Sequence, residues 1–175
     1  MEIILVRHTT PAIEKGVCYG QADIDVTDTF NDEIKVILNQ IPINDKDTVY
    51  YSSPLKRCKV LAEKLSDEII FDNRLKELNF GDWELKKWDD INKIELDVWM
   101  KNFVAIPTTN GESYIDLHAR TVQFLNEVKT LNKKRIVVVT HAGVIRSLYT
   151  YINKKSLENS FDLKLNYGHI IKFTL

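Results

Sequence analysis

The sequence contains little cysteine and no long apolar run. Cys18 and Cys58 are its two cysteines, and neither belongs to a CxxC pair. This pattern gives no sign of a zinc site, a redox motif or a disulfide framework, so we expect two free thiols in a reducing compartment. No apolar stretch approaches the length of a membrane-spanning helix. The acidic, strand-like N-terminus is also unlike a basic-then-apolar leader, and we therefore expect a cytoplasmic protein that binds no membrane.

The sequence also lacks an excess of charge of either sign. Lys and Arg number 24 against 25 Asp and Glu, which gives a formal net charge of −1. A chain without a basic surplus is not expected to bind nucleic acid, so any anion site must come from a local cluster of cationic side chains. The 175 residues are 44% hydrophobic and 28% charged. Together with the absence of a repeat or linker, this composition predicts a single domain over residues 1–175.

Glycine and proline are scarce, with six and four residues respectively. Pro11, Gly16 and Gly20 fall within residues 9–28, which show no apolar periodicity. This stretch is therefore predicted to be a long loop. Long ordered loops inside compact domains are often functional, which marks this one as a candidate part of a site.

Short apolar runs alternate with helical patterns along the chain. The predicted strands cover residues 3–6, 48–52, 68–71, 135–140 and 169–174, and the last alternates like an edge strand. The predicted helices begin after Thr27, after Ser53, at Ile91, after Ser113 and after Gly143. Strands that alternate with helices favour a mainly parallel central sheet with helices on both faces. The expected fold class is therefore α/β, with three layers in the order α/β/α.

Two of the predicted helices have clear starting signals. Ser53-Pro54 supplies a capping residue followed by proline at the first helical position, which puts Arg57 in the first turn. Ser113 is the predicted cap of a helix whose apolar stripe consists of Ile115, Ala119, Val122 and Leu125. His118 falls on the same stripe, where a lone histidine is usually a core residue without a functional role.

Polar residues follow directly on three of the predicted strands. Arg7 and His8 end the first strand, Arg57 comes just after the second, and His141 follows the fourth. Ligands of open α/β sheets bind beyond the carboxyl ends of the strands, so we expect these side chains to meet. Arginine matches a phosphate with its planar fork of donors, and histidine acts as nucleophile, acid or base near neutral pH. Each residue alone is equally compatible with a solvated strand end, but their coincidence predicts an anion site.

Four motifs occur in the order typical of the histidine phosphatase superfamily, the phosphoglycerate mutase-like group. They are Val6-Arg7-His8-Thr9, Ser52-Ser53-Pro54-Leu55-Lys56-Arg57, Leu75-Lys76-Glu77-Leu78-Asn79-Phe80-Gly81-Asp82-Trp83-Glu84 and Thr140-His141-Ala142-Gly143. The sequence resembles this family over nearly its whole length, and the resemblance implies a phosphoglycerate mutase-like fold. It also implies His8 as the nucleophile, Arg7, Arg57 and His141 as the phosphate pocket, and Glu77 as the proton donor. No metal and no cofactor are implied.

Those residue types suit a phosphoryl transfer without a metal. Two arginines supply permanently charged donors to the transferring oxygens, and a protonated His141 would add another. The amides of Ala142 and Gly143, at the start of the following helix, are further candidate contacts to the substrate. His8 would attack phosphorus to form a phosphohistidine, and Glu77 would protonate the leaving oxygen. The resemblance thus implies a histidine acid-type phosphomonoesterase, a hydrolase of small-molecule phosphate esters.

The sequence departs from the family pattern at three places. Thr9 stands where the family usually has glycine after the Arg-His pair, Thr10-Pro11 replaces the usual Glu-Thr, and Leu85 replaces glycine after Trp83-Glu84. These changes bear on the substrate contacts, among which we count Thr9. Glu84 is kept as an alternative acid, although its offset from the Phe-Gly pair differs from that of the family.

The loop from Gly16 to Asp23 resembles that of the α-ribazole phosphatases. That branch removes the 5′-phosphate from α-ribazole phosphate during assembly of the cobalamin nucleotide loop, and the resemblance implies Tyr19 and Gly20 as substrate contacts. A glycine-punctuated surface loop is the plain alternative. A phosphoglycerate mutase-type isomerase is a second function compatible with the motifs, although the chain is short for one. A catalytically inactive phosphate-binding module is a third.

Overall fold

A five-stranded sheet lies at the centre of the computed structural model, which describes residues 1–175. Strands β1 (Glu2–Arg7), β2 (Thr48–Ser52), β3 (Ile69–Phe71) and β4 (Arg135–Thr140) are parallel, and β5 (Ile170–Thr174) runs antiparallel to β1. The strand order is β3-β2-β4-β1-β5. The predicted mainly parallel sheet and the predicted edge position of the last strand are both confirmed.

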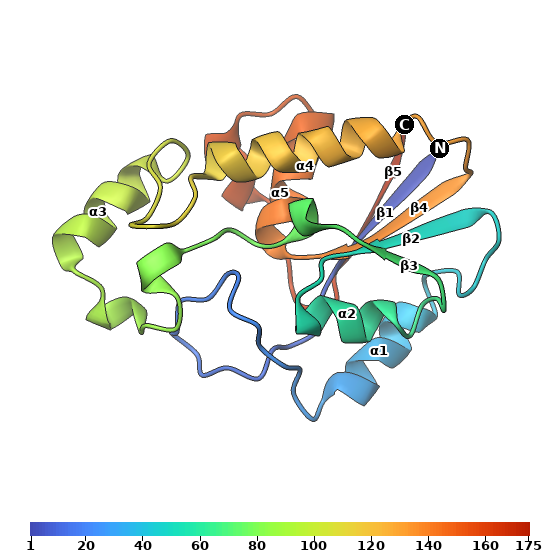
Figure 1. Ribbon diagram of the computed structural model, residues 1–175, viewed down its shortest axis with the longest axis horizontal. Helices are drawn as coiled ribbons and strands as arrows, with labels where there is room; N and C mark the ends of the chain where they lie inside the picture. The colour runs from blue at the N-terminus through green and yellow to red at the C-terminus, as the bar shows by residue number, and fades with distance from the viewer.

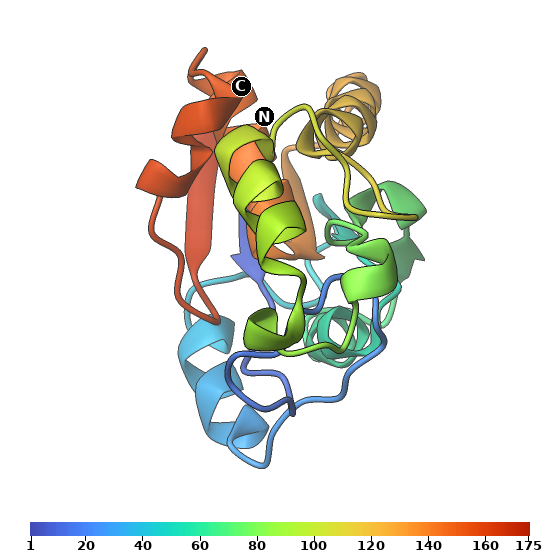
Figure 2. The ribbon, with the colours of Figure 1, turned by 90° about the vertical axis from the view of Figure 1, so that its left-hand side faces the viewer.

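Helices cover both faces of this sheet, as Figure 1 shows. Helices α1 (Phe30–Leu38) and α2 (Lys56–Ala62) pack on one face, and α4 (Tyr114–Val128) and α5 (Ala142–Ile152) pack on the other. Helix α3 (Lys93–Asn102) lies beyond the sheet, and in Figure 2 it stands in front of it. The chain also contains four short 3-10 helices, at Asn73–Leu75, Gly81–Trp83, Trp88–Asp90 and Leu157–Asp162. The three-layer α/β fold expected from the sequence is confirmed.

The apolar run of β1 is explained by a core on each side of the strand. Ile3 and Leu5 pack with α4 and α5, whereas Ile4 and Val6 pack with α1 and α2. All four side chains are at most 1% exposed. Successive residues of a strand point to opposite faces, so a strand covered on both sides needs apolar residues at every position. The same reasoning applies to β4, whose burial pattern is nearly continuous.

Helix α2 begins later than the sequence predicts. Ser53 and Leu55 lie in the connection, and the Ser53 hydroxyl accepts a hydrogen bond from the Leu55 amide over 3.3 Å. Leu55 is extended, with φ −65° and ψ 138°, so the first helical residue is Lys56 rather than Pro54. Arg57 still lies in the first turn, as predicted.

Helix α4 starts as predicted but turns a different face to the core. Ser113 accepts a hydrogen bond from the Asp116 amide, and the Asp116 carboxylate accepts one from the Ser113 amide, which forms a complete capping box. The predicted stripe is right only at its end: Leu125 is buried, but Ile115 is 47% exposed and Ala119 is also exposed. The buried residues of α4 are Tyr114, Leu117, Thr121, Phe124, Leu125 and Val128.

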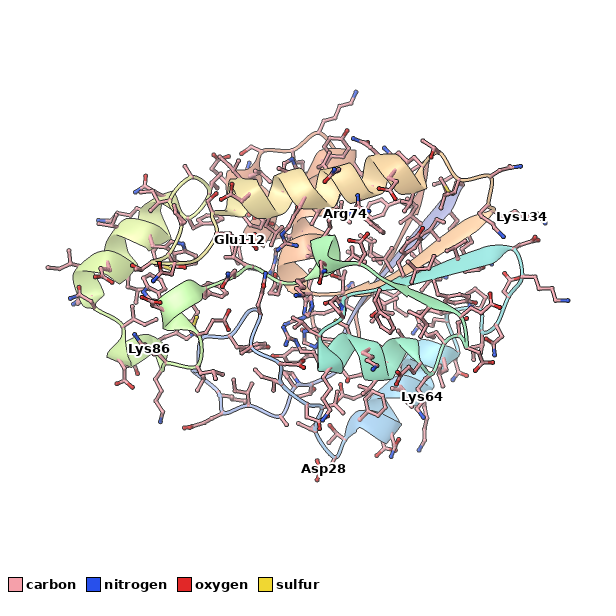
Figure 3. All side chains as sticks on the ribbon, in the orientation of Figure 1. Asp28, Lys64, Arg74, Lys86, Glu112 and Lys134 are labelled. Carbon is pink, nitrogen blue, oxygen red and sulfur yellow. The ribbon has the colours of Figure 1, made fainter.

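The two ends of the sheet differ in what surrounds them. Lys134, which precedes β4, lies at one end of the molecule in Figure 3, and Glu112 lies toward the other, near the start of α4. The carboxyl ends of the parallel strands face the second of these ends, where α3 and the long N-terminal loop gather.

Both cysteines are buried free thiols, as expected. No helix combines the length and the apolar character that crossing a bilayer requires.

Candidate active site

The carboxyl ends of the strands bring the predicted polar side chains together. The rings of His8, after β1, and His141, after β4, lie 5.1 Å apart between centroids. His8 is 2% exposed, and Arg57 and His141 are completely buried. Buried charged and polar side chains are rare unless they are paired or functional. This cluster therefore marks the candidate active site.

His8 is held with one ring nitrogen free. Its Nδ1 lies 2.7 Å from the carbonyl oxygen of Thr9. A carbonyl oxygen only accepts, so Nδ1 carries the proton and Nε2 carries the lone pair. Burial, followed by the positive charges of Arg57 and Arg7, holds the pKa of His8 well below its usual value, against the opposing effect of the Thr9 carbonyl. His8 is therefore neutral at physiological pH, the form in which an imidazole acts as a nucleophile.

Two arginines lie near this histidine, Arg7 at the end of β1 and Arg57 in the first turn of α2. Arg57 donates from Nη1 to the carbonyl of Ala22 over 2.9 Å and from Nη2 to that of Gly20 over 2.5 Å. Arg7 donates from Nη1 to the carbonyl of Leu165 over 2.7 Å. The Nε atoms of both arginines are buried without an acceptor in the protein. Buried donors are almost always paired, and an anion bound between the two guanidinium groups would account for them.

The protein surroundings of His141 favour the neutral ring. Its Nε2 lies 2.8 Å from the hydroxyl of Ser53 and 3.4 Å from the thiol of Cys58. Burial and the positive charge of Arg57 hold the pKa of His141 well below its usual value, and no carboxylate contacts the ring to oppose this. A phosphate dianion is the kind of ligand that would favour the protonated form.

Glu77 lies against the N-terminus of α5. Its Oε2 accepts a hydrogen bond from the Gly143 amide over 3.0 Å, and its Oε1 accepts one from the Leu78 amide over 2.9 Å. A Cβ at position 143 would lie 2.2 Å from Oε1 of Glu77, so this close approach requires glycine. Ala142, beside it, is buried. The structure thus places Glu77 and Gly143, two predicted site residues, in direct contact.

Glu84, the alternative acid, is engaged by backbone amides and does not line the cleft. Its two carboxylate oxygens accept hydrogen bonds of 2.8 to 3.1 Å from four backbone amides, those of Gly20, Gln21, Ala22 and Phe80. Each oxygen serves two amides, so Glu84 fastens the N-terminal loop to the segment that contains Glu77. The same loop supplies the carbonyl groups of Gly20 and Ala22 that hold Arg57.

The ion pair between Arg120 and Glu112 fixes the backbone around Glu77. Arg120 donates to the carbonyls of Arg74, Lys76 and Glu77 over 2.6, 2.6 and 3.0 Å. It also pairs with Glu112, with 2.5 Å between Nη2 and Oε1. Glu112 in turn accepts a hydrogen bond from the Asn79 amide over 3.0 Å. The chain from 74 to 79 is therefore held by one guanidinium and one carboxylate.

Tyrosines from two loops cover the arginines. The hydroxyl groups of Tyr19 and Tyr167 lie 3.0 Å apart. Arg57 lies 5.3 Å from the ring centroid of Tyr19, and Arg7 lies 4.1 Å from that of Tyr167. Thr9 is completely buried, and its hydroxyl has no partner in the protein. Aromatic rings over guanidinium groups stabilise the cations and limit the access of water to the site.

A cleft of about 210 Å³ opens next to His8. Of the predicted site residues, Arg7, His8, Tyr19, Glu77 and Gly143 line it. Arg57 and His141 lie buried behind it, and Thr9, Gly20 and Ala142 do not line it.

Two residues of the site were missed from the sequence, namely Arg146 and Tyr167. Arg146 lines the cleft and donates from Nε to the carbonyl of Leu163 over 3.2 Å. It lies three residues after Gly143 on α5, so helical spacing from the His141 motif is a signal that could have identified it. Tyr167 comes from the C-terminal loop and belongs to no motif, so the sequence offered no signal for it.

Comparisons with known proteins agree with this geometry. Residues 3–175 match the Histidine phosphatase superfamily (branch 1). Phosphoglycerate mutase-like protein 4 of Arabidopsis thaliana is 32% identical over 161 residues, which are 85% of this chain and 69% of that protein. Metal-independent phosphoserine phosphatase of the same plant is 29% identical over 167 residues, 89% of this chain and 70% of that protein.

A solved structure shows the same fold. The α-ribazole phosphatase from Shigella flexneri matches with a TM-score of 0.86 and 21% identity, over 98% of this chain and 89% of that one. The family match begins in β1 and ends in the last strand, so it includes every strand end that forms the site. The chain therefore belongs to the histidine phosphatase superfamily, branch 1.

Proposed function

We propose that this protein hydrolyses a small phosphomonoester through a phosphohistidine intermediate on His8. The observation that carries the proposal is the buried neutral His8, whose Nδ1 is fixed by the Thr9 carbonyl, between two arginines with unpaired Nε donors. The family and its phosphatase relatives support a hydrolase. We infer a cytoplasmic enzyme of one domain.

The first half of the reaction forms the intermediate. Nε2 of His8 attacks phosphorus, the N–P bond forms, and the bond from phosphorus to the ester oxygen breaks. Glu77 gives its proton to the departing oxygen. Arg7 and Arg57 stabilise the negative charge on the three transferring oxygens. Next to the phosphate dianion, His141 takes a proton from solvent and becomes a further donor, and it returns this proton to solvent when inorganic phosphate leaves.

The second half regenerates the enzyme. A water molecule attacks phosphorus, Glu77 takes one of its protons, and the N–P bond breaks to release inorganic phosphate and neutral His8. No group of three or more His, Cys, Asp or Glu side chains is arranged to hold a metal ion. The charge stabilisation in this proposal comes from the two arginines and His141 alone.

The candidate substrate is α-ribazole 5′-phosphate, in assembly of the cobalamin nucleotide. The resemblance of the loop at residues 16–23 and the match to a solved α-ribazole phosphatase support it. In the structure, this loop supplies Tyr19 to the cleft and the carbonyl groups that hold Arg57. The discriminating measurement is a screen of phosphorylated metabolites for phosphate release. It should include α-ribazole 5′-phosphate, phosphoserine and 3-phosphoglycerate.

The phosphohistidine is tested by trapping. Enzyme quenched during turnover without acid and analysed by mass spectrometry should contain phosphate on His8. His8→Ala should abolish turnover without loss of the fold, and EDTA should leave the rate of the unaltered enzyme unchanged. Phosphate on His141 with none on His8 would reverse the assignment, and activity lost to EDTA and restored by a divalent ion would contradict the metal-free mechanism.

The substrate screen, extended to p-nitrophenyl phosphate, separates the alternatives. A phosphoglycerate mutase-type isomerase would move phosphate within 3-phosphoglycerate and release little to water. An inactive phosphate-binding module would release none from p-nitrophenyl phosphate. The presence of Arg7, His8, Arg57, Glu77 and His141 in one cluster favours the hydrolase over the inactive module.

A further inference from the structure

The cleft beside His8 has two chemically different ends. Arg7, His8 and Glu77 line the end at which phosphorus would react. The remainder is mostly aromatic. Nine of the fourteen lining residues are hydrophobic, and seven of these nine are aromatic. Six of the lining side chains at that end are Phe80, Trp88, Trp99, Phe103, Tyr114 and Phe161. The reaction proposed above needs only the first end, so the second requires its own explanation.

The aromatic side chains form one continuous wall. Phe80 lies 5.7 Å from Trp88 and 5.8 Å from Trp99 between ring centroids. Phe103 lies 6.3 Å from Trp99 and 5.2 Å from Phe161. These rings come from residues 80–103, which include α3, and from the 3-10 helix at 157–162, which is far from them in sequence. A wall assembled from separate elements is a built surface rather than a local cluster.

Part of this wall is not used by the core. Phe161 is 51% exposed, and Phe80, Trp88 and Phe103 are only partly buried against the core. Exposed apolar surface inside a cleft is typical of ligand-binding sites. Aromatic faces and edges favour aromatic partners, beyond the general effect of burial.

We infer that the leaving group of the substrate carries a flat apolar ring near the ester oxygen, and that the wall selects for it. The inference rests on the proposed function, because it assigns the leaving-group side of the same site. A cavity of about 150 Å³ holds one benzene molecule. The open cleft of about 210 Å³ therefore has room for a flat ring in addition to the phosphoryl group.

The same wall disfavours small zwitterionic esters. An ammonium group like that of phosphoserine would find one carboxylate in the cleft, Glu77, which already accepts from the Leu78 and Gly143 amides. Phosphoserine also has no ring to bury against the wall, so it gains none of the apolar burial that an ester with a ring gains there. Apart from the cations beside His8, Arg146 is the one cation that lines the cleft. A hydrogen-bond acceptor on the ring of the substrate would find a donor in this guanidinium group.

The first experiment compares esters whose leaving alcohols have similar basicity. We expect kcat/KM for 2-phenylethyl phosphate to exceed that for ethyl phosphate by about 10- to 100-fold, which is the effect of burying one phenyl-sized group. Phosphoserine should be no better than ethyl phosphate. Equal values for the phenylethyl and ethyl esters, or a preference for phosphoserine, would overturn the inference.

A pair of matched variants then tests the wall itself. Phe161→Ala should lower the ratio of kcat/KM for the phenylethyl ester to that for the ethyl ester by about 5- to 10-fold, because one face of the wall is lost. Phe71→Ala is the control, since Phe71 lies on β3 outside the cleft and is 44% exposed. It should leave the ratio unchanged. Trp88→Ala is a second variant of the wall. If Phe161→Ala and Trp88→Ala both leave the ratio unchanged, the wall does not select for the ring.

A binding measurement separates failure of this inference from failure of the proposed function. All three tryptophans, Trp83, Trp88 and Trp99, belong to the aromatic cluster, so their fluorescence reports on the cleft. The probe is 3-phenylpropylphosphonate, in which a methylene replaces the ester oxygen and prevents turnover. It should bind at least tenfold more tightly than propylphosphonate. If no ester is hydrolysed but this difference is found, the proposed hydrolysis fails and the ring site stands. If both phosphonates bind equally, the ring site fails.

Discussion

Two glutamates near the site, seven residues apart, have different tasks. Glu84 accepts hydrogen bonds from four amides and has no remaining freedom to exchange a proton with a substrate. Glu77 accepts from two amides and lines the cleft beside His8. Both were candidates for the acid from the sequence, and hydrogen bonding distinguishes them.

The role of Glu77 is tested with leaving groups of different quality. General acid catalysis is worth about 10²–10⁴-fold, and most when the leaving group is poor. Glu77→Gln should therefore slow phosphorylation of His8 by an alkyl phosphate far more than by p-nitrophenyl phosphate, measured in single-turnover or burst experiments. Equal losses with the two substrates would mean that Glu77 shapes the cleft without donating a proton.

Leu85 adopts a backbone conformation that favours glycine. Its φ is +66° and its side chain is 61% exposed, so the strain is not offset by burial. Relief of left-handed strain of about 1–2 kcal/mol exceeds the entropic cost of glycine, about 0.4–1 kcal/mol. Leu85→Gly should therefore raise the free energy of unfolding by about 1 kcal/mol, measured by urea denaturation. Leu85→Ala, which keeps the strain, should not stabilise, and a loss of stability in Leu85→Gly would refute this account.

Four of the residues that sequence reasoning identified share one property. Arg7, His8, Arg57 and His141 follow buried strands, and the carboxyl ends of parallel strands meet at one edge. Their convergence could therefore be predicted from strand positions alone. Tyr167 could not, because it reaches the site from a loop whose path depends on tertiary packing.

At the scale of elements, helix α4 shows why a helical stripe alone does not fix the buried face. Thr121 lies on the true stripe, and its hydroxyl and the ring of His118 both contact the hydroxyl of Ser147 on α5, at 2.8 and 2.9 Å. Polar residues that hydrogen-bond to each other between two packed helices look, in the sequence, like residues of a solvent-exposed helix face. Apolar residues such as Ile115 then give a second, misleading stripe.

The pairing of α4 with the segment around Glu77 leads to a testable expectation. Arg120→Ala would leave Glu112 and three carbonyls without their donor, and removing one partner of a largely buried pair costs roughly 3 kcal/mol. We also expect a greater loss of turnover with alkyl phosphates than with p-nitrophenyl phosphate, because Glu77 loses its position.

The control is an exposed ion pair at the surface. Lys35 and Asp32 pair at 2.7 Å with side chains 71% and 83% exposed, so Lys35→Ala should change neither stability nor leaving-group dependence measurably. If Arg120→Ala lowers urea stability but reduces turnover of both substrates equally, Arg120 supports the fold without positioning the acid.

At the scale of the whole molecule, the buried histidines link stability to pH. The pKa values of His8 and His141 are well below the usual 6.5 in the folded state. Below pH 6.5 the unfolded chain therefore binds more protons than the folded protein, so stability falls as pH decreases. Each histidine contributes a slope of up to about 1.4 kcal/mol per pH unit.

This slope can be measured by urea unfolding at pH 7.5, 6.5 and 5.5. The free energy of unfolding should change little between pH 7.5 and 6.5 and should decrease markedly at pH 5.5. His141→Gln should reduce the slope below pH 6.5, because one of the two histidines that must charge on unfolding is gone. A wild-type slope no steeper than that of the variant would show that His141 is charged in the folded protein.

The strand order has a consequence for the chain as it emerges during synthesis. Strand β4, near the end of the sequence, inserts between β1 and β2. Until residue 140 has left the ribosome, both earlier strands present unpaired backbone to solvent, and Ile3 to Val6 presents its apolar side chains as well. Such edges promote association between chains. Nascent chains stalled before β4 should consequently depend on chaperones, and enzymatic activity appears only when the central gap has been filled.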